Sequence, residues 1–497
     1  MLAAVRTVVA FGIILQVAGF AKLLVIANYF GAGASLDAYY LGLVIPTFLT
    51  GVTGGILQTG IVPAYVSTGE RGDRAGAGRL GSVALTWTAV VLSVIALLLT
   101  ITRSVSVPLL AQGVGPETHR ELESVFALLV WTAPINGVAD AGALLLNAEG
   151  RFAAAAAAPL LNAIVGTIVL VASRGGTVAA LVWSLLAGLS AQLLVVMLAI
   201  RRAGIRLRPQ LTLPAIPVHM LGTVALPVLL TMVLANLVPA FVQAVSARAG
   251  TGAISAMGYA ARLHNSLVQA VVLSVSTVLL PRFARLLAQG KHTELRNTLE
   301  RVFAATLLFS VAALMLVAAG GPVIVRMLLE RGNFNSADAQ LVAKVWLALT
   351  AGLLGATWFI FLVRLFQVQQ LLWFLFTLGC VSVVVNVTLA YTFLPMWGVV
   401  GVALGNSVAY TLIMAGGHVR ADRMLGRVLG IRTLGFVART GLANLGAYFA
   451  AVFWGSVSAG MSPIVTFFGQ FLVIATANLL VARTAPLGIS VAALLKR

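Results

Sequence analysis

Long apolar runs follow one another along almost the whole chain, and they constrain its fold more than any other feature. Of the 497 residues, 60% are hydrophobic and only 9% are charged, and the mean hydropathy is +1.04. Soluble domains carry about 25% charged residues, so composition excludes that class. The runs are continuous rather than alternating, which also excludes a transmembrane β-barrel. We therefore predict an all-α protein that crosses a membrane many times.

About fourteen of these runs are long enough to span a bilayer, and the segments between them are too short for soluble domains. The predicted spans cover residues 7–29, 38–64, 80–101, 122–147, 153–173, 177–200, 218–246, 254–279, 302–320, 340–365, 370–393, 397–417, 433–455 and 463–483. The first two spans of each half are similar in plan. This faint repeat predicts two six-helix lobes, 1–210 and 211–425, and two additional helices in 426–497.

Lysine and arginine residues gather in alternate segments between the spans. With the N-terminus in the cytoplasm, inner segments hold 22 of them and outer segments hold seven. This bias predicts that both chain ends are cytoplasmic. It also accounts for the net charge of +19, so we expect no nucleic acid partner. The basic segment 280–301 has helical spacing with a break at Gly290, and it is either a helix on the cytoplasmic surface or a solvated loop.

Charged residues inside predicted spans include Lys22 in the first, Asp140 in the fourth and Arg262 in the eighth. A charge at a helix centre costs about 2.5–3.5 kcal/mol on insertion scales, so such residues face protein or water and often mark a functional site. Lys22 and Arg262 are either cations of a wet cavity or partners of neighbouring acids. Asp140 either exchanges a coupling proton or cation, or forms a structural ion pair with one of them.

Asp37 follows the short turn 31–35, which separates the first two spans. Its carboxylate has two interpretations. It is a gate residue on the outer face, or it stabilises the first turn of its own helix, where an acid suits the helix dipole.

Catalysis has little support in the sequence. The five histidines are scattered without metal-ligand spacing, and there is no Walker-type Gly-Lys-Ser/Thr loop for ATP. We predict that the protein is not an enzyme and uses no cofactor or metal.

Four stretches, in order along the chain, share their pattern with a known family. They are GFAKLLVIANYFGAGASLDAYYLGLVIPTFL (19–49), LLNAEGRFAAAAAAPLLNAI (145–164), YAARLHNSLVQAVVLSVSTVLLPRFA (259–284) and ERGNFNSADA (330–339). They resemble the MurJ/MviN-type lipid II flippases of the multidrug/oligosaccharidyl-lipid/polysaccharide exporter superfamily. The resemblance implies two six-helix lobes in a V around a central cavity, with a groove for a lipid tail formed by the last two helices.

The resemblance also implies roles for individual residues. The family lines its cavity with arginines that grip a pyrophosphate; here Lys22 and Arg262 keep positive charge at two such positions, and Gln16 occupies another. Asp37 matches the family's aspartate. These four residues are the expected substrate-binding set, in which arginine binds phosphate oxygens bidentately and lysine acts as a point charge.

Two departures from the family's pattern concern other residues of the cavity that the resemblance implies. Thr50 and Gly51 stand where the family usually carries paired arginines. Asn236 and Asn386 stand near positions where some members bind sodium through carboxylates. Amides at membrane depth suit hydrogen bonds to sugar hydroxyls, although bonding between helices is their commoner use.

The resulting hypothesis is a flippase that moves a polyprenyl-diphosphate-linked oligosaccharide across the bacterial inner membrane by alternating access. We expect a monomer surrounded by membrane lipids, and coupling to a monovalent cation or proton. Two alternatives remain open: an ion-coupled exporter of small amphipathic molecules, and a membrane scaffold without transport activity. Positive charge in the cavity argues against cationic cargo, because like charges repel strongly in a low dielectric.

Overall fold

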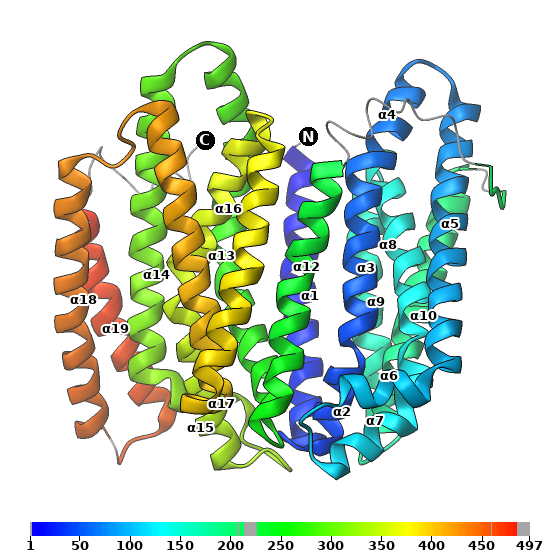
Figure 1. Cartoon of the computed structure of the whole chain (residues 1–497). Helices are drawn as coiled ribbons and strands as arrows, with labels where there is room; N and C mark the ends of the chain where they lie inside the picture. Colours follow the sequence, from blue (N-terminus) through cyan, green and yellow to red (C-terminus); the bar gives the residue numbers. More distant parts are fainter. Residues whose placement is uncertain (1, 206–207, 213–225, 459, 485–497) are drawn as a thin grey trace. The chain divides into compact units, whose positions relative to one another are not determined.

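All regular structure that the computed structural model describes is helical (Figure 1). The described residues are 2–205, 208–212, 226–458 and 460–484. The chain divides into two compact units: the first contains residues 1–255 with 331–334, and the second contains 256–330 with 335–497. The predicted lobe boundaries at 210 and 425 stay a prediction.

The first unit contains the helices up to the start of α13. They are α1 (Leu2–Phe30), α2 (Ala34–Gly42), α3 (Val44–Ile56), the π turn η1 (Leu57–Ile61), α4 (Val62–Glu70), α5 (Arg74–Ile101), α6 (Arg103–Leu110), α7 (Pro116–Leu129), α8 (Thr132–Ala148), α9 (Phe152–Ala172), α10 (Val178–Arg202), α12 (Leu226–Ser246) and the short 3₁₀ turn η3 (Ala247–Ala249).

The second unit contains most of α13 and everything after it except 331–334. Its helices are α13 (Ala253–Ala288), α14 (His292–Leu329), α15 (Ser336–Ala351), α16 (Leu353–Val368), α17 (Leu372–Leu425), α18 (Ile431–Val457) and α19 (Pro463–Ala482).

The all-helical membrane class is confirmed. Every predicted span overlaps a helix within the part of the chain that the structure describes. Nine helices in that part are long and apolar enough to cross a membrane, or up to eleven if each bent pair forms one span. The predicted number of fourteen is therefore approximate.

Each unit has its own apolar core. In the first unit, Leu41, Leu122 and Phe126 are fully buried where α2 packs against α7. In the second unit, the rings of Phe303 and Trp358 meet edge to face with centroids 5.1 Å apart. Aromatic pairs of this kind contribute about 0.5–1.5 kcal/mol beyond the apolar area that they bury.

Two predicted spans are bent by 44° at short breaks, one between α7 and α8 and one between α15 and α16. At each break, a side-chain hydroxyl group replaces the missing backbone N–H donor. Thr132 Oγ1 donates to the carbonyl of Leu129 at 2.6 Å, and Ser407 Oγ of α17 donates to that of Ala348 at 2.6 Å. Helix breaks at membrane depth require such replacement bonds, because no lipid group can supply them.

The long element α17 consists of two helices that meet at Gly398, whose φ of 57° and ψ of −138° lie outside the helical range. Gly401 packs against the backbone of Phe393, and Gly405 packs against that of Leu389. These pairs show that the two arms run antiparallel. The sequence prediction of separate spans at 370–393 and 397–417 is confirmed in this respect.

The basic segment 280–301 is neither a separate surface helix nor a loop. Helix α13 continues to Ala288 and α14 begins at His292, so the segment forms two helix ends and the turn between them. Gly290, with φ of +66°, supplies the left-handed residue that this turn needs. The predicted break at Gly290 was right, but both flanking helices are longer than their apolar cores suggested.

The last two helices are joined by a reciprocal amide pair. Asn444 Nδ2 donates to Asn478 Oδ1 at 3.1 Å, and Asn478 Nδ2 donates to Asn444 Oδ1 at 2.8 Å. Gln470 Nε2 lies 3.3 Å from the carbonyls of Ala319 on α14 and Ala451 on α18. These bonds attach α18 and α19 to each other and to α14. Figure 1 shows both helices beside α14.

The orientation derived from basic residues predicts opposite exposure for Glu117 and Arg427, both of which are exposed. In a Cys380→Ser background, which removes the single native cysteine, Glu117→Cys should react with an impermeant maleimide on intact cells. Arg427→Cys should react only after the cells are opened. If Arg427→Cys but not Glu117→Cys is labelled on intact cells, the topology is the inverse of the one predicted.

Candidate functional site

Lys22 lies inside the first unit, where α1 packs against α9. A Cβ atom on Gly166 of α9 would stand 2.6 Å from Lys22 Nζ and 3.0 Å from the carbonyl oxygen of Ser184 on α10. The missing side chain of Gly166 therefore makes room for the ammonium group. Among the described residues, no carboxylate forms an ion pair with Lys22.

Arg262 lies on α13 in the second unit, and its side chain is exposed. Asp140 on α8 is half-buried and accepts a hydrogen bond from Asn136 Nδ2 at 3.1 Å. Within the described ranges it forms no ion pair with Lys22 or Arg262, so the structural pair considered from the sequence is not formed there. Because Lys22 and Arg262 belong to different units, their convergence on one diphosphate stays a prediction.

Asp37 is buried, with 2% of its surface exposed, and it caps a helix other than its own. One carboxylate oxygen accepts the backbone N–H of Gly252 at 2.6 Å. The other accepts the backbone N–H of Ser255 at 2.7 Å and its hydroxyl at 2.5 Å. Those groups form the start of α13, where free N–H groups and the helix dipole both favour an anion. The start of α2 has no side-chain cap; Asp37 lies in its first turn, but the hydrogen bonds of its carboxylate go to the start of α13.

Gly252 allows this contact to form. Its φ of +84° favours glycine, and a Cβ atom there would stand 2.7 Å from the carbonyl oxygen of Ala32. The turn between α1 and α2 therefore touches the turn before α13. Asp37 lies four residues into α2, directly beside this contact.

Asn236 of α12 faces α3 at Gly51. Its Nδ2 donates to the carbonyl of Met232 at 2.9 Å, and a Cβ atom on Gly51 would overlap its Oδ1. Gly51 stands where the family usually carries an arginine, and packing explains this difference, because only glycine leaves room for the Asn236 amide. Gln16, on α1, is exposed.

Asn386 of α17 is buried, with 1% of its surface exposed, and only the nitrogen of its amide has a hydrogen-bond partner among the described residues. Its Nδ2 donates to the carbonyl of Ser382 at 3.0 Å, whereas its Oδ1 has no partner among the described residues. A free amide oxygen of this kind can accept a sugar hydroxyl or help to coordinate a hard cation. Asn386 and Asn236 lie in different units, so a shared cation site stays a prediction.

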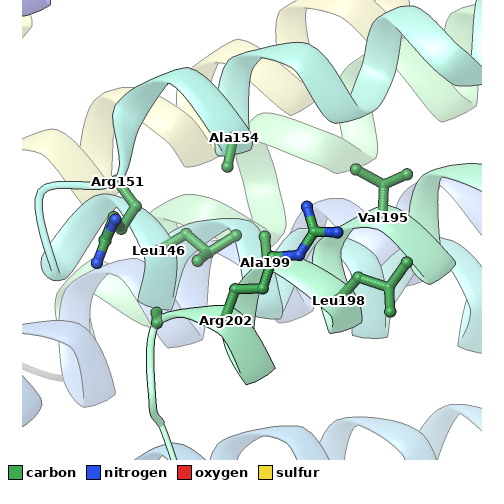
Figure 2. A pocket seen from close by; sticks show the side chains of 8 residues that line it. Leu146, Arg151, Ala154, Val195, Leu198, Ala199 and Arg202 are labelled. Atoms are coloured by element: carbon green, nitrogen blue, oxygen red, sulfur yellow. The ribbon is translucent and has the colours of Figure 1, made fainter.

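Two neighbouring cavities lie where the predicted cytoplasmic turns of the first unit meet. The larger, about 770 Å³, is lined by Arg74, Arg79 and Arg208 together with Glu70 and Glu149. The smaller, about 300 Å³, is bordered by the α8–α9 turn and the end of α10, and its charged lining residues are both arginines (Figure 2).

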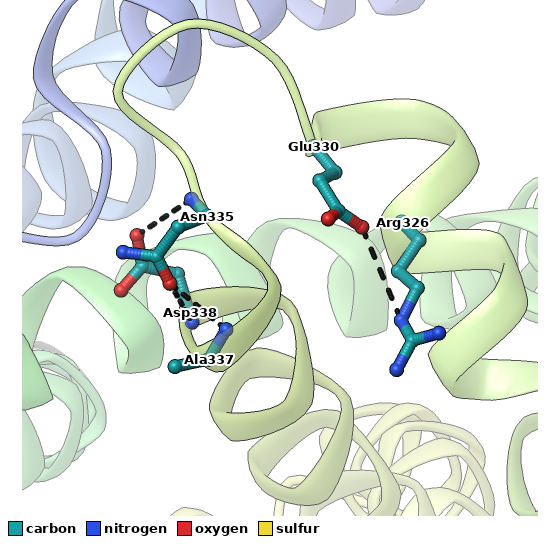
Figure 3. Close-up of polar contacts among 5 residues, drawn as sticks. All are labelled: Arg326, Glu330, Asn335, Ala337 and Asp338. Atoms are coloured by element: carbon teal, nitrogen blue, oxygen red, sulfur yellow. Dashed lines mark hydrogen bonds and ion pairs between the residues drawn. The ribbon is translucent and has the colours of Figure 1, made fainter.

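The stretch 330–339 completes two helix ends. The backbone N–H of Asn333 donates to the carbonyl of Asn28 at 3.0 Å and its side chain donates to that of Tyr29 at 2.6 Å, at the end of α1. Asn335 Oδ1 then accepts the N–H of Asp338 at 3.0 Å, and Asp338 reciprocates at the start of α15 (Figure 3). This reciprocal arrangement is a capping box. Figure 3 also shows Arg326 and Glu330, a surface ion pair at 3.9 Å.

The sequence model of a family described as lipid II flippase MurJ matches residues 26–476. The chain belongs to this family. A probable lipid II flippase MurJ of Rhizobium meliloti is 30% identical over 408 residues, which cover 79% of this chain and 75% of the relative. The corresponding protein of Vibrio cholerae is 26% identical over 455 residues, which cover 88% and 85%. The family resemblance drawn from the four stretches is confirmed.

Solved structures agree on the fold. A lipid II flippase MurJ in an inward closed conformation superimposes with a TM-score of 0.80 at 20% identity, covering 96% of this chain and 98% of that chain. An inward-facing multidrug transporter of the MATE family, in the MOP superfamily, gives 0.67 at 14% identity, with 85% and 98% covered. The chain thus shares its fold with membrane transporters.

The cap on α13 is the feature that sequence reasoning missed. Asp37 and Ser255 are 218 residues apart, and no local pattern links them. The Gly250–Gly252 turn before α13 was the available signal, since a helix start without its own Ser, Thr, Asp or Asn cap needs an acceptor from elsewhere.

Replacing Asp37 should destabilise the protein more than replacing an ordinary cap. Asp37→Ala leaves two buried N–H groups and a hydroxyl without their acceptor, at a cost of about 3 kcal/mol. The matched control is Asp73→Ala, which removes an exposed cap whose Oδ1 accepts Gly76 N–H at 2.7 Å. That loss should cost about 1 kcal/mol. Thermal unfolding in detergent measures both. Equal losses for the two variants would show that the Asp37 contact contributes little.

Proposed function

We propose that this chain flips a polyprenyl-diphosphate-linked oligosaccharide, with lipid II as the first candidate, across the bacterial inner membrane. The family match over residues 26–476 carries the proposal, and relatives named as probable lipid II flippases support it. Similar transporters have been solved in inward-facing and outward-facing conformations, which supports alternating access.

Lys22 and Arg262 are the proposed ligands of the diphosphate. A charged head group cannot enter hydrocarbon unaided, because an isolated ion loses tens of kcal/mol of solvation there by idealised estimates. Cations at membrane depth offset that loss. The absence of an acid beside Lys22 in the described structure leaves its charge available to an anion. Gln16 would add a neutral hydrogen-bonding group on the same helix as Lys22.

Asp37 is proposed as the residue that holds the outer gate closed. Its carboxylate joins α2 to the start of α13, a helix that runs from the first unit into the second. Opening on that side would have to break these bonds. Asp140, Asn236 and Asn386 are the proposed contacts of a coupling proton or monovalent cation.

The arrangement in the membrane is part of the same proposal. The lobes are 1–210 and 211–425, with 426–497 as two additional helices, both termini are cytoplasmic and the protein is a monomer. An exporter of small amphipathic cations has less support, since Lys22 and Arg262 repel such cargo. A scaffold without transport activity is an outcome that the following experiment would reveal.

Neutralising either cation should abolish most transport without unfolding the protein. In proteoliposomes with lipid II, Lys22→Ala and Arg262→Ala should each slow flipping by roughly tenfold to a hundredfold, the range for losing a hydrogen bond to a charged group. Arg262→Lys should retain part of the activity if charge dominates over bidentate geometry. The matched control is Lys291→Ala, which removes a cation that is 51% exposed and pairs with Glu294 on the surface.

Complementation of a strain depleted of its lipid II flippase tests the substrate. The unmodified chain should restore growth, and the two cavity variants should not. Growth without lipid II flipping by the purified chain would point to another lipid-linked glycan. Full flipping by stable Lys22→Ala and Arg262→Ala variants would refute their role, and no flipping of any lipid-linked sugar would favour the scaffold.

A further inference from the structure

The smaller cavity of the first unit is a groove with two arginines at its edge and an apolar floor. Its charged lining residues are Arg151, in the turn between α8 and α9, and Arg202, in the last turn of α10. The remaining lining residues are all apolar, namely Leu146, Ala154, Val195, Leu198, Ala199 and Ala203. Figure 2 shows Leu146 between the two arginine side chains.

The positive charge of this groove is not neutralised within the described chain. Neither Arg151 nor Arg202 forms an ion pair or side-chain hydrogen bond with any residue that the structure describes. Glu149, the acid nearest to Arg151 in sequence, accepts a hydrogen bond from Tyr65 Oη at 2.6 Å and lines the larger cavity instead. The groove therefore presents two guanidinium groups that lack an anion.

One side of the groove is continuous with an apolar surface. Leu198 lines the groove and is 41% exposed, and Leu194, one helical turn earlier on α10, is 60% exposed. Helix α10 is long and apolar enough to span a membrane, so exposed leucines on it suit contact with acyl chains. Its last turn, with Arg201 and Arg202, then lies at the level of lipid head groups.

We propose that this groove binds an acidic phospholipid of the cytoplasmic leaflet. Arg151 and Arg202 would hold the phosphodiester, and the acyl chains would lie along Leu194 and Leu198. Guanidinium groups bind phosphate oxygens bidentately, and basic pockets between membrane helices are known to select acidic head groups. A free phosphate satisfies only the arginines, whereas a phospholipid also covers the leucines. The proposal uses the predicted cytoplasmic side of this turn and does not depend on the transported substrate.

The test compares the binding of phosphatidylglycerol with that of phosphatidylcholine. The full chain in detergent is titrated with each lipid, and native mass spectrometry gives the apparent Kd of the first bound lipid. An arginine near an acidic lipid surface contributes on the order of fivefold in affinity. The double variant Arg151→Gln/Arg202→Gln should therefore weaken phosphatidylglycerol binding by at least fivefold and leave phosphatidylcholine binding unchanged. Arg201→Gln, on the same helical turn but outside the groove lining, is the matched control and should bind as the unmodified chain does.

Two further measurements need no variant. The preference of the unmodified chain for phosphatidylglycerol should fall as ionic strength rises. A phosphatidylglycerol with a photoreactive acyl chain should label α10 around Leu194 and Leu198, and 10-fold excess inorganic phosphate should not prevent the labelling. An unchanged lipid preference in the double variant, an equal loss in Arg201→Gln, or displacement by inorganic phosphate would each overturn the proposal.

Discussion

The need to pair every backbone polar group inside a bilayer shapes this protein more than any side-chain contact. Long helices satisfy that need along most of their length, and the difficult places are their ends and breaks. At those ends and breaks, individual side chains form the missing hydrogen bonds. Asp37 pairs the first N–H groups of α13, Asn333 pairs the last carbonyls of α1, and Ser407 pairs a carbonyl at the break between α15 and α16. All three of these groups are supplied from a distant part of the sequence.

That distinction explains how far the sequence could predict the structure. Apolar length is a local property, so the helical membrane class and the positions of the spans followed directly from the chain. The separate spans 370–393 and 397–417 and the break at Gly290 were also predicted, because the local sequence marks both. The bend at Gly352 was not predicted, since it depends on the close approach of Ser407 from α17. Likewise, the ends of α13 and α14 carry charged residues that hydropathy alone assigns to a loop.

The candidate site was predicted as a set of residue types, and its geometry came from packing. The cation at Lys22 was evident from its position within an apolar span, but the glycine that accommodates it lies on α9. In the sequence, Gly51 was only a departure from an arginine that the family usually carries. In the structure it is the partner of Asn236, an amide 185 positions further along the chain. Complementary pairs of this kind, one small and one polar residue, are characteristic of helix contacts in membranes.

The amide pair between Asn444 and Asn478 has a consequence for the order in which the protein is assembled. These helices are consecutive, and their two reciprocal bonds satisfy both amides without help from α14. A hydrogen bond between membrane helices contributes about 0.6 kcal/mol on average, and roughly 1–2 kcal/mol in model peptides. The last two helices can therefore enter the bilayer as a ready hairpin with its polar groups already covered. Gln470 Nε2 can bond the carbonyl of Ala451 within the hairpin, whereas its contact with Ala319 forms only when the hairpin packs against α14.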